Sequence, residues 1–330
     1  MQITVLGAGS WGTALAAALA PRHEVRLWAR DRAALSSMAA SRRNERYLPG
    51  IELPAALHYA GELSDAVAHA GGGLLLIATP TDALRGLARQ LRAIAVLPPI
   101  VWLCKGLERA SAAMAHEVVR DELGVQHAGP LSGPSFAQEV AKGLPTALTV
   151  AGDDPFCQLV TGALHGPSLR IYSTDDVTGV EVGGAVKNVM AIATGICDAL
   201  ALGHNARAAL ITRGLAEITR FGLALGAQAQ TFMGLTGIGD LILTCTGELS
   251  RNRQVGLMLG RGLRLPEALD RLGHVAEGVW SAAAVQRRAA SLGVRMPITE
   301  AVCAVLQEQA SPRQALEQLL ARDPKREGLE

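Results

Sequence analysis

The sequence predicts an α/β Rossmann-type doubly wound sheet followed by an all-helical C-terminal domain. Short apolar runs alternate with helical stretches through the first half of the chain, and a glycine-rich turn follows the first of these runs. After about Asp175 the pattern becomes helical almost throughout. Strands that alternate with helices pair in parallel through right-handed crossovers. Because 330 residues exceed one domain of average size, we expect residues 1–176 to form the sheet domain and residues 177–330 the helical domain.

Each expected strand is a short, mostly apolar run, as is typical of strands buried on both faces of a sheet. These runs are Gln2–Leu6, Glu24–Trp28, Leu74–Ala78, Ile100–Cys104, Ala128–Leu131, Pro145–Ala151 and Leu169–Ser173. In the first half, the expected helices run from the glycine turn to about Ala20 and lie near 62–70, 82–95 and 110–123. In the second half, they lie near 179–200, 206–225, 240–246, 252–260, 266–271, 279–291, 298–308 and 312–321.

The composition excludes several classes of protein. A hydrophobic content of 49%, with 18% charged residues and a net charge of +1, excludes a disordered chain and argues against nucleic-acid binding. The sequence contains no run of 18 consecutive apolar residues, so it predicts no membrane span. The first twenty residues are apolar, but they lack the basic start of a secretion signal and contain a glycine turn. Five scattered cysteines and eight ungrouped histidines indicate no disulfide framework and no metal site, which fits the cytoplasm.

The first motif is Gly7-Ala8-Gly9-Ser10-Trp11-Gly12, which matches GxGxxG directly after a strand and before a helix. In a dinucleotide-binding turn, Gly7 would allow the tight bend, Gly9 the approach of a pyrophosphate, and Gly12 the packing of helix on strand. The backbone amides of Ser10 and Trp11 would then point at the phosphates. A glycine-rich turn that binds no cofactor is the alternative.

The residues after the second expected strand bear on the choice of cofactor. An acidic residue here favours the ribose hydroxyls of NAD, whereas an arginine accommodates the 2′-phosphate of NADP. Arg30 precedes Asp31 at this place. We therefore expect NADP, as NADPH in its reduced form, to be preferred and NAD to be tolerated, with a solvated Arg30 as the competing interpretation.

Lysine is rare in this chain, since only four of the 31 basic residues are lysines. Lys105 follows an apolar run and so projects from the carboxyl edge of the sheet, where open α/β sheets bind ligands. Lys187 lies in the middle of a long apolar helix with Gly183, Gly184 and Ala191 on its face, which predicts room for a ligand over the amine. Burial and a second cation would lower its pKa and make it a general base. The alternatives are a surface lysine at 105 and a lysine at 187 that reaches solvent along its helix.

Polar residues at expected helix starts form the remaining candidates. Asp240 begins a helix and Thr244 follows one turn later on the same face, so both would line a pocket. Ser250 is a plausible N-cap, beyond which free amides and Arg251 would bind a phosphate. Gly133-Pro134-Ser135-Phe136-Ala137 is a strand-to-helix turn to which the same reasoning applies. Simple helix caps and solvated arginines are the competing interpretations.

Together these motifs resemble the bacterial NAD(P)-dependent glycerol-3-phosphate dehydrogenase family over essentially the whole chain. The resemblance lies in GAGSWGTALA at 7–16, LWARD at 27–31, CKG at 104–106, SGPSFAQEV at 132–140, GAVKNVMAIA at 184–193, GIGDLILTCT at 237–246, SRN at 250–252 and VAEGV at 275–279. Trp11 stands where Phe or Tyr is frequent, and Ala276 where Val is common. The family implies an NAD(P)-binding domain at 1–176 and a substrate-binding domain at 177–330, usually in a cytoplasmic homodimer.

The resemblance also implies roles for individual residues. Lys187 corresponds to the proton acceptor, and Lys105 to a residue that contacts both substrate and cofactor. The implied substrate contacts are Lys105, Gly133, Ser135, Lys187, Asn188, Asp240, Thr244, Ser250, Arg251 and Asn252. The implied cofactor contacts are Gly7, Gly9, Ser10, Trp11, Gly12, Arg30, Lys105, Ala137, Arg251, Val275 and Glu277.

The family reaction interconverts sn-glycerol 3-phosphate and dihydroxyacetone phosphate and supplies the backbone of phospholipids. We hypothesise that neutral Lys187 takes the proton of the C2 hydroxyl as hydride leaves C2, while Lys105 polarises the oxygen and Asp240 holds the lysine. A phosphorylated triose is therefore the expected partner, with no metal, nucleic acid or membrane span. A hydroxyacyl-CoA, ketopantoate or sugar-acid dehydrogenase and a catalytically silent NADP-sensing protein are the alternatives.

Overall fold

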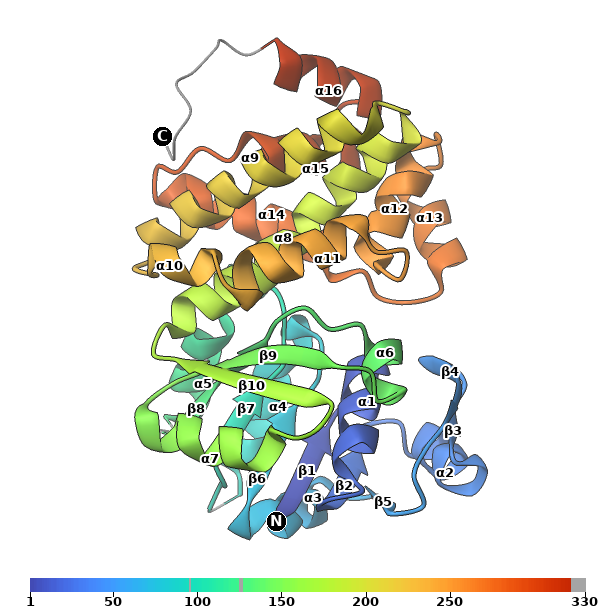
Figure 1. Ribbon diagram of the computed structural model, residues 1–330, viewed down its shortest axis with the longest axis vertical. Helices are drawn as coiled ribbons and strands as arrows, with labels where there is room; N and C mark the ends of the chain where they lie inside the picture. Colours follow the sequence, from blue (N-terminus) through green and yellow to red (C-terminus); the bar gives the residue numbers. More distant parts are fainter. Residues whose placement is uncertain (95, 125–126, 322–330) are drawn as a thin grey trace. The chain divides into compact units, whose positions relative to one another are not determined.

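The chain forms two compact units, which we call the sheet unit and the helical unit. A computed structural model describes residues 1–94, 96–124 and 127–321. The sheet unit comprises Met1–Cys104 and Ala115–Val177, and the helical unit comprises Lys105–Met114 and the residues from Thr178 onward. The predicted class is confirmed, since an α/β unit is followed by a unit built from helices (Figure 1).

The sheet unit is organised around an eight-stranded sheet of order β10-β9-β8-β7-β6-β1-β2-β5. Its strands are β1 (Gln2–Leu6), β2 (Glu24–Trp28), β5 (Leu57–Ala60), β6 (Leu74–Ile77), β7 (Ile100–Trp102), β8 (Ala128–Ser132), β9 (Thr146–Ala151) and β10 (Leu169–Thr174). A separate hairpin pairs β3 (Arg43–Asn44) with β4 (Leu48–Glu52). The central strand β6 is completely buried, which explains its unbroken apolar run.

The prediction of parallel pairing is wrong at one place in the sheet. Strands β8 and β9 pair antiparallel, whereas the other neighbours in the sheet are parallel. The connection between β8 and β9 contains only the short helix α6 (Ala137–Ala141), which packs on α1 (Ser10–Leu19). The chain therefore re-enters the sheet at the end where β8 finishes, because no long crossover carries it back.

The remaining helices of the sheet unit follow the strands in the expected alternation. They are α2 (Arg32–Ser41), α3 (Leu63–His69), η1 (Ala70–Gly72), α4 (Thr81–Arg92), α5 (Ala115–Leu123) and α7 (Asp154–Leu164). The helices α2 and α7 were not predicted. Residue 95, at the end of the helix expected at 82–95, lies outside the described residues. The helix expected at 110–123 begins only at Ala115, because the segment before it packs in the helical unit through Leu107 and Met114.

The helical unit surrounds the long helix α8 (Val177–Ala199). Its other elements are α9 (Gly203–Ala224), α10 (Ala229–Phe232), the π-helical turn η2 (Leu235–Gly239), α11 (Asp240–Thr246), α12 (Arg251–Gly260), α13 (Leu265–Leu272), α14 (Glu277–Ser291), α15 (Pro297–Leu306) and α16 (Pro312–Leu320). Among the described residues, α8 alone is long and apolar enough to span a membrane, and it is buried over most of its length. It is therefore the core helix of this unit.

Two glycines allow α8 and α12 to approach each other closely. A Cβ at Gly195 would lie 2.2 Å from the carbonyl oxygen of Arg253, and one at Gly256 would lie 2.1 Å from that of Ile192. Any larger residue would separate the helices. This contact fixes the start of α12, which carries three of the predicted site residues, against the helix that carries Lys187.

Candidate active site

Two lysines and one aspartate form a buried cluster within the helical unit. The Lys187 Nζ on α8 lies 2.6 Å from Oδ1 of Asp240, the first residue of α11. The Lys105 Nζ lies 3.0 Å from the other carboxylate oxygen, Oδ2. The side chains of Lys105, Lys187 and Asp240 are only 13%, 8% and 1% exposed. One carboxylate thus holds two amines that are 82 residues apart in sequence, and the structure brings together the three residues predicted to carry the chemistry.

The electrostatics of this cluster favour a proton-transfer role for Lys187. Burial and the Lys105 ammonium together lower the pKa of Lys187 from 10.5 to about 8, although the Asp240 carboxylate opposes the shift. Burial alone would raise the pKa of Asp240, but the two neighbouring ammonium groups outweigh it and hold that pKa below its usual value. Near neutral pH, Asp240 is therefore charged and Lys187 can gain or lose a proton.

Thr244 completes the surroundings of the Lys187 amine. Lys187 Nζ donates a hydrogen bond of 3.0 Å to Thr244 Oγ1, and this hydroxyl in turn donates to the backbone oxygen of Asp240 at 2.6 Å. The predicted arrangement of Asp240 and Thr244 on one helical face is therefore present. The two bonds fix the position of the Nζ atom relative to α11.

Gly183 has a different role from the one that the sequence predicts. A Cβ at this position would lie 2.1 Å from the backbone oxygen of Thr236, in the π-helical turn before α11. The glycine therefore makes room for neighbouring backbone rather than for a ligand over the amine. Its consequence for the site is still direct, because the close contact places Asp240 beside Lys187.

Asn188 and Asn252 form a buried chain of amides next to the cluster. The Asn188 side chain donates to the backbone oxygen of Lys105 at 3.4 Å, and Asn252 Nδ2 donates to Asn188 Oδ1 at 3.0 Å. Asn252 Oδ1 accepts from the backbone amide of Gly278, in the first turn of α14, at 2.9 Å. These contacts join the Lys105 segment to α8, α12 and α14. The part of Gly278 in this series of hydrogen bonds was not predicted from the sequence.

Ser250 and Arg251 lie at the start of α12, as predicted. Ser250 is buried and caps the helix, since its hydroxyl accepts a hydrogen bond from the amide of Arg253 at 3.3 Å. Arg251 is partly exposed. An ion pair that the sequence did not predict also holds α12 against α8, since Arg253 donates to Asp198 on α8 at 2.7 Å. That ion pair joins residues 55 apart in sequence, and no local pattern indicates it.

The glycine turn of the sheet unit is closely packed at Gly7 and Gly12 and open at Gly9. Gly7 has a φ of +121°, and a Cβ there would lie 2.7 Å from the backbone oxygen of Ala78. A Cβ at Gly12 would lie 2.0 Å from the Gly7 oxygen, so this glycine lets α1 pack on the turn. At Gly9, by contrast, a Cβ would meet no other described part of the chain within 4 Å. The turn is tightly packed underneath and open at Gly9, which fits a bound pyrophosphate.

The other predicted cofactor residues of the sheet unit lie around that turn and at the end of β2. Ser10 and Trp11 form the start of α1, which has no side-chain cap. The indole Nε1 of Trp11 is buried and has no hydrogen-bond partner among the described residues. Arg30 is exposed just beyond β2, and Asp31 caps α2 by accepting from the amide of Ala34 at 3.0 Å.

The remaining predicted residues occupy the starts of two helices. Gly133 has a φ of +140° after β8, Ser135 donates to the Gly133 oxygen at 3.0 Å, and Ala137 begins α6 in the sheet unit. In the helical unit, Val275 is 42% exposed and Glu277 begins α14. In the parts of the chain that the structure describes, no three His, Cys, Asp or Glu residues gather as metal ligands.

This chain is similar to known proteins over almost its whole length. The models for the N-terminus and the C-terminus of NAD-dependent glycerol-3-phosphate dehydrogenase match residues 2–157 and 176–317. A protein of Paucimonas lemoignei named glycerol-3-phosphate dehydrogenase (NAD(P)+) is 60% identical over 333 residues, which cover 100% of this chain and 99% of the relative. One of Herminiimonas arsenicoxydans with the same name is 59% identical and covers 99% of each chain.

A solved structure of a protein with the same name is also similar to this chain. The crystal structure of glycerol-3-phosphate dehydrogenase from Coxiella burnetii has a TM-score of 0.93 and 42% sequence identity, and the match covers 97% of this chain and 98% of that chain. The similarity thus extends across both units rather than over the nucleotide turn alone. The chain therefore belongs to the NAD-dependent glycerol-3-phosphate dehydrogenase family.

Proposed function

We propose that this chain interconverts sn-glycerol 3-phosphate and dihydroxyacetone phosphate by hydride transfer at C2, with NAD(P) as the cofactor. The relatives named as glycerol-3-phosphate dehydrogenases support the reaction. The observation that carries the proposal is the buried pair of Lys187 and Asp240, whose charged atoms lie 2.6 Å apart. A buried amine with a pKa of about 8 is suited to exchange one proton with a hydroxyl near neutral pH.

In the oxidative direction, neutral Lys187 accepts the proton of the C2 hydroxyl. In the reductive direction, its ammonium donates that proton to the oxygen of the ketone. NAD(P), which the turn at Gly7–Gly12 would hold, would supply the hydride chemistry when bound. Thr244 and Asp240 hold the amine in place throughout, because the three are joined by hydrogen bonds of 2.6–3.0 Å.

Lys105 and Asp240 supply the fixed charges of the site. The Lys105 ammonium favours negative charge on the C2 oxygen, and a preorganised charge of this kind lowers the free energy of the transition state. The Asp240 carboxylate offsets the repulsion between the two amines, because each amine contacts a different carboxylate oxygen. The residue that was predicted to hold Lys187 thus also positions Lys105.

The start of α12 would bind the phosphate of the substrate. Ser250 caps this helix, Arg251 begins it, and free amides at a helix start attract anions. The Asn252 side chain is already joined to Asn188 and Gly278, so it would contribute one remaining N–H while it holds α12 in position. Binding energy from the phosphate then orients the carbon that reacts.

We assign the cofactor to residues 1–176, through the turn at Gly7–Gly12, and the substrate to residues 177–330. A preference for NADP over NAD is supported by Arg30, which is exposed beyond β2. One oxygen of Asp31 is occupied in capping α2, which reduces its availability to a ribose hydroxyl.

In Arg30→Ala, we expect the KM for NADPH to rise at least tenfold and the KM for NADH to change less than threefold. Equal changes would remove the case for NADP preference.

Three wider properties complete the proposal. We expect a homodimer that acts in the cytoplasm, and we expect its glycerol 3-phosphate to serve phospholipid synthesis. These follow the pattern of the family that the chain resembles. Analytical ultracentrifugation tests the first, fractionation of cells the second, and labelling of phospholipids after depletion of the protein the third.

One assay separates the proposed function from the alternatives. NADPH and NADH oxidation should be measured with dihydroxyacetone phosphate, ketopantoate, a 3-ketoacyl-CoA and a keto sugar acid. We expect dihydroxyacetone phosphate to give a kcat/KM at least a hundredfold above the others. A higher value with another carbonyl would indicate a related dehydrogenase. Tight NADPH binding without oxidation by any carbonyl would indicate a sensor.

A further inference from the structure

The last turn of α8 carries a group of charges apart from the buried cluster of two lysines and one aspartate. Asp198 Oδ2 accepts hydrogen bonds from Nε and Nη2 of Arg253 at 3.0 and 2.7 Å. Arg207 on α9 donates to the same carboxylate at 3.2 Å. The side chains of Asp198, Arg207 and Arg253 are 15%, 24% and 14% exposed. One partly buried carboxylate therefore joins α8 to both α9 and α12.

Two of these charges lie at helix ends that disfavour them. Asp198 lies in the last turn of α8, where the partial negative charge of a helix C-terminus repels a carboxylate. Arg253 lies in the first turn of α12, where the partial positive charge of a helix N-terminus repels a cation. Neither charge therefore stabilises its own helix end. Their contact with each other offsets both repulsions, so the pair serves the packing of α12 on α8.

The contacts of two consecutive residues with α8 fix the rotation of α12 about its own axis. Asn252 is joined to Asn188 at 3.0 Å, and Arg253 is joined to Asp198, ten residues further along α8. Ten residues span about 15 Å of helix. The first turn of α12 is therefore held at two separated points, whereas the close glycine contact between the two helices sets only their distance.

The direction of the phosphate donors on α12 depends on this rotation. Ser250 caps the helix and Arg251 begins it. A rotation of about 20° moves a side-chain atom that lies about 5 Å from the helix axis by about 2 Å. A misplacement of about 1 Å can lower the rate of an enzyme about a hundredfold. A small change in the rotation of α12 would therefore weaken the contacts with a phosphate.

We propose that Asp198 is a positioning residue for the phosphate of the substrate, and that it acts through Arg253 by fixing the rotation of α12. The proposal rests on the proposed function, in which the start of α12 binds this phosphate. Arg207 contacts the carboxylate from α9, so its loss would leave the contact between Asp198 and α12 in place.

Rates of NADPH oxidation with dihydroxyacetone phosphate and with dihydroxyacetone test the proposal, because the second substrate lacks the phosphate. Asp198→Ala should lower kcat/KM for dihydroxyacetone phosphate at least twentyfold and for dihydroxyacetone less than threefold, while NADPH binding stays within twofold. Arg253→Gln, which decides the test if Asp198→Ala does not fold, should give the same pattern. The double variant should lose no more than twofold beyond Arg253→Gln, because residues that act through one contact are not additive.

Arg207→Gln and Asp270→Asn are the matched controls. Arg207 contacts Asp198 from α9, and Asp270 is an exposed aspartate on α13. Both variants should change the two kcat/KM values less than threefold, and urea unfolding should show that every variant is folded. Equal losses with both substrates, additive losses in the double variant, or equal losses in Arg207→Gln and Arg253→Gln would overturn the proposal.

A binding measurement separates this proposal from the proposed function. If the parent chain oxidises NADPH with neither substrate, the proposed function fails. Titration calorimetry with inorganic phosphate then decides the role of Asp198. Asp198→Ala should weaken phosphate binding at least tenfold and Asp270→Asn less than twofold. Equal affinities in the parent and in Asp198→Ala, or no binding by the parent, would overturn the positioning role.

Discussion

The lowered pKa of Lys187 makes a quantitative prediction about the pH dependence of glycerol 3-phosphate oxidation. At pH 7, a pKa of about 8 leaves about one amine in ten neutral, whereas the ordinary value of 10.5 would leave about one in three thousand. We therefore expect kcat/KM to rise about tenfold above pH 7 and to reach a plateau near pH 9.5. An amine with ordinary pKa would give a rise of about a hundredfold per two pH units and no plateau below pH 10. In the reductive direction the dependence should be inverted, because the ammonium donates the proton.

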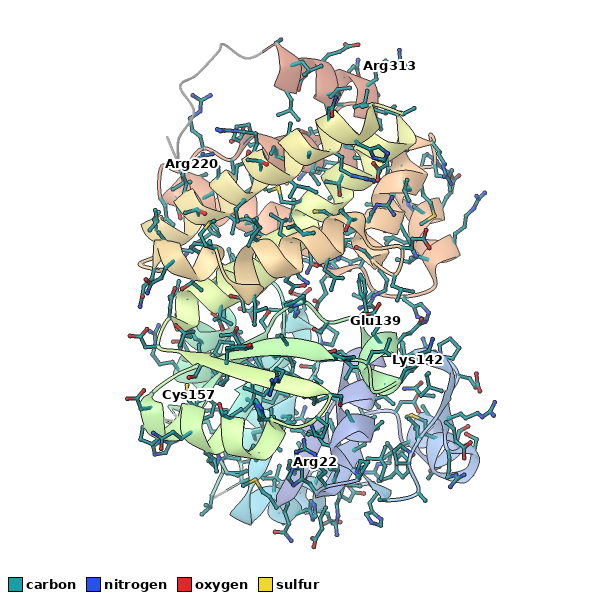
Figure 2. All side chains as sticks on the ribbon, viewed as in Figure 1. Arg22, Glu139, Lys142, Cys157, Arg220 and Arg313 are labelled. Carbon is teal, nitrogen blue, oxygen red and sulfur yellow. The ribbon has the colours of Figure 1, made fainter. Side chains whose placement is uncertain are left out.

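Two substitutions should move this inflection in opposite directions. The Lys105 ammonium lowers the pKa of Lys187 and the Asp240 carboxylate raises it. Lys105→Met should therefore move the inflection to higher pH, and Asp240→Asn should move it to lower pH. Both variants should also lose activity, because each removes a charge from the site. Lys142→Met is the matched control, since Lys142 is an exposed lysine after α6 in the sheet unit (Figure 2), and it should leave the inflection in place.

The measurement is the initial rate of NADPH formation at substrate concentrations well below KM, from about pH 7 to about pH 10. In this range the substrate phosphate, with a second pKa of about 6, remains a dianion and does not contribute to the profile. A flat profile, or shifts of the same sign in Lys105→Met and Asp240→Asn, would refute the assignment of Lys187 as the titrating base.

Three other substitutions test separate parts of the structure. Lys187→Arg keeps a positive charge that cannot be lost, so turnover should fall by at least a thousandfold while NADPH binding, measured by fluorescence, stays within twofold. Gly12→Val would place a side chain where a Cβ already lies 2.0 Å from the Gly7 oxygen, so we expect destabilisation by about 2 kcal/mol in urea unfolding and loss of NADPH binding. Because burial raises the pKa of Glu217 to about 7, the folded protein binds more protons than the unfolded chain between about pH 4.5 and pH 7 and loses stability as the pH rises through this range. Glu217→Gln should remove this dependence of stability on pH, whereas an unchanged dependence would contradict the raised pKa.

Much of the fold was predictable because buried elements leave strong patterns in the sequence. The runs that form β1, β2, β6, β9 and β10 are apolar and end at turns, and the core helices α8 and α9 are long. The strands β3, β4 and β5 were not predicted, since they are short and partly exposed. The antiparallel pairing of β8 and β9 was also beyond a periodicity argument, because strand direction depends on the connection between strands and not on the residues within them.

The site shows the same division between local and distant contacts. Asp240 and Thr244 were correctly placed on one face, because residues four apart on a helix are neighbours. The contacts of Asp240 with Lys105 and Lys187 join distant parts of the chain, and only the tertiary structure shows them. Gly183 was interpreted as room for a ligand because a missing side chain looks the same in sequence whether backbone or substrate occupies the space.

The separation of the two units has a consequence for how the enzyme can be altered. Lys105 follows β7 in sequence but belongs with the helical unit, so all groups that shift the pKa of Lys187 lie within that unit. Arg30 and the turn at Gly7–Gly12 lie within the sheet unit. Cofactor preference and the pKa of the base therefore depend on different parts of the chain. Arg30→Ala should change the KM for NADPH without moving the inflection near pH 8, and a shift of that inflection by more than about half a pH unit would mean that the sheet unit also sets the charge of Lys187.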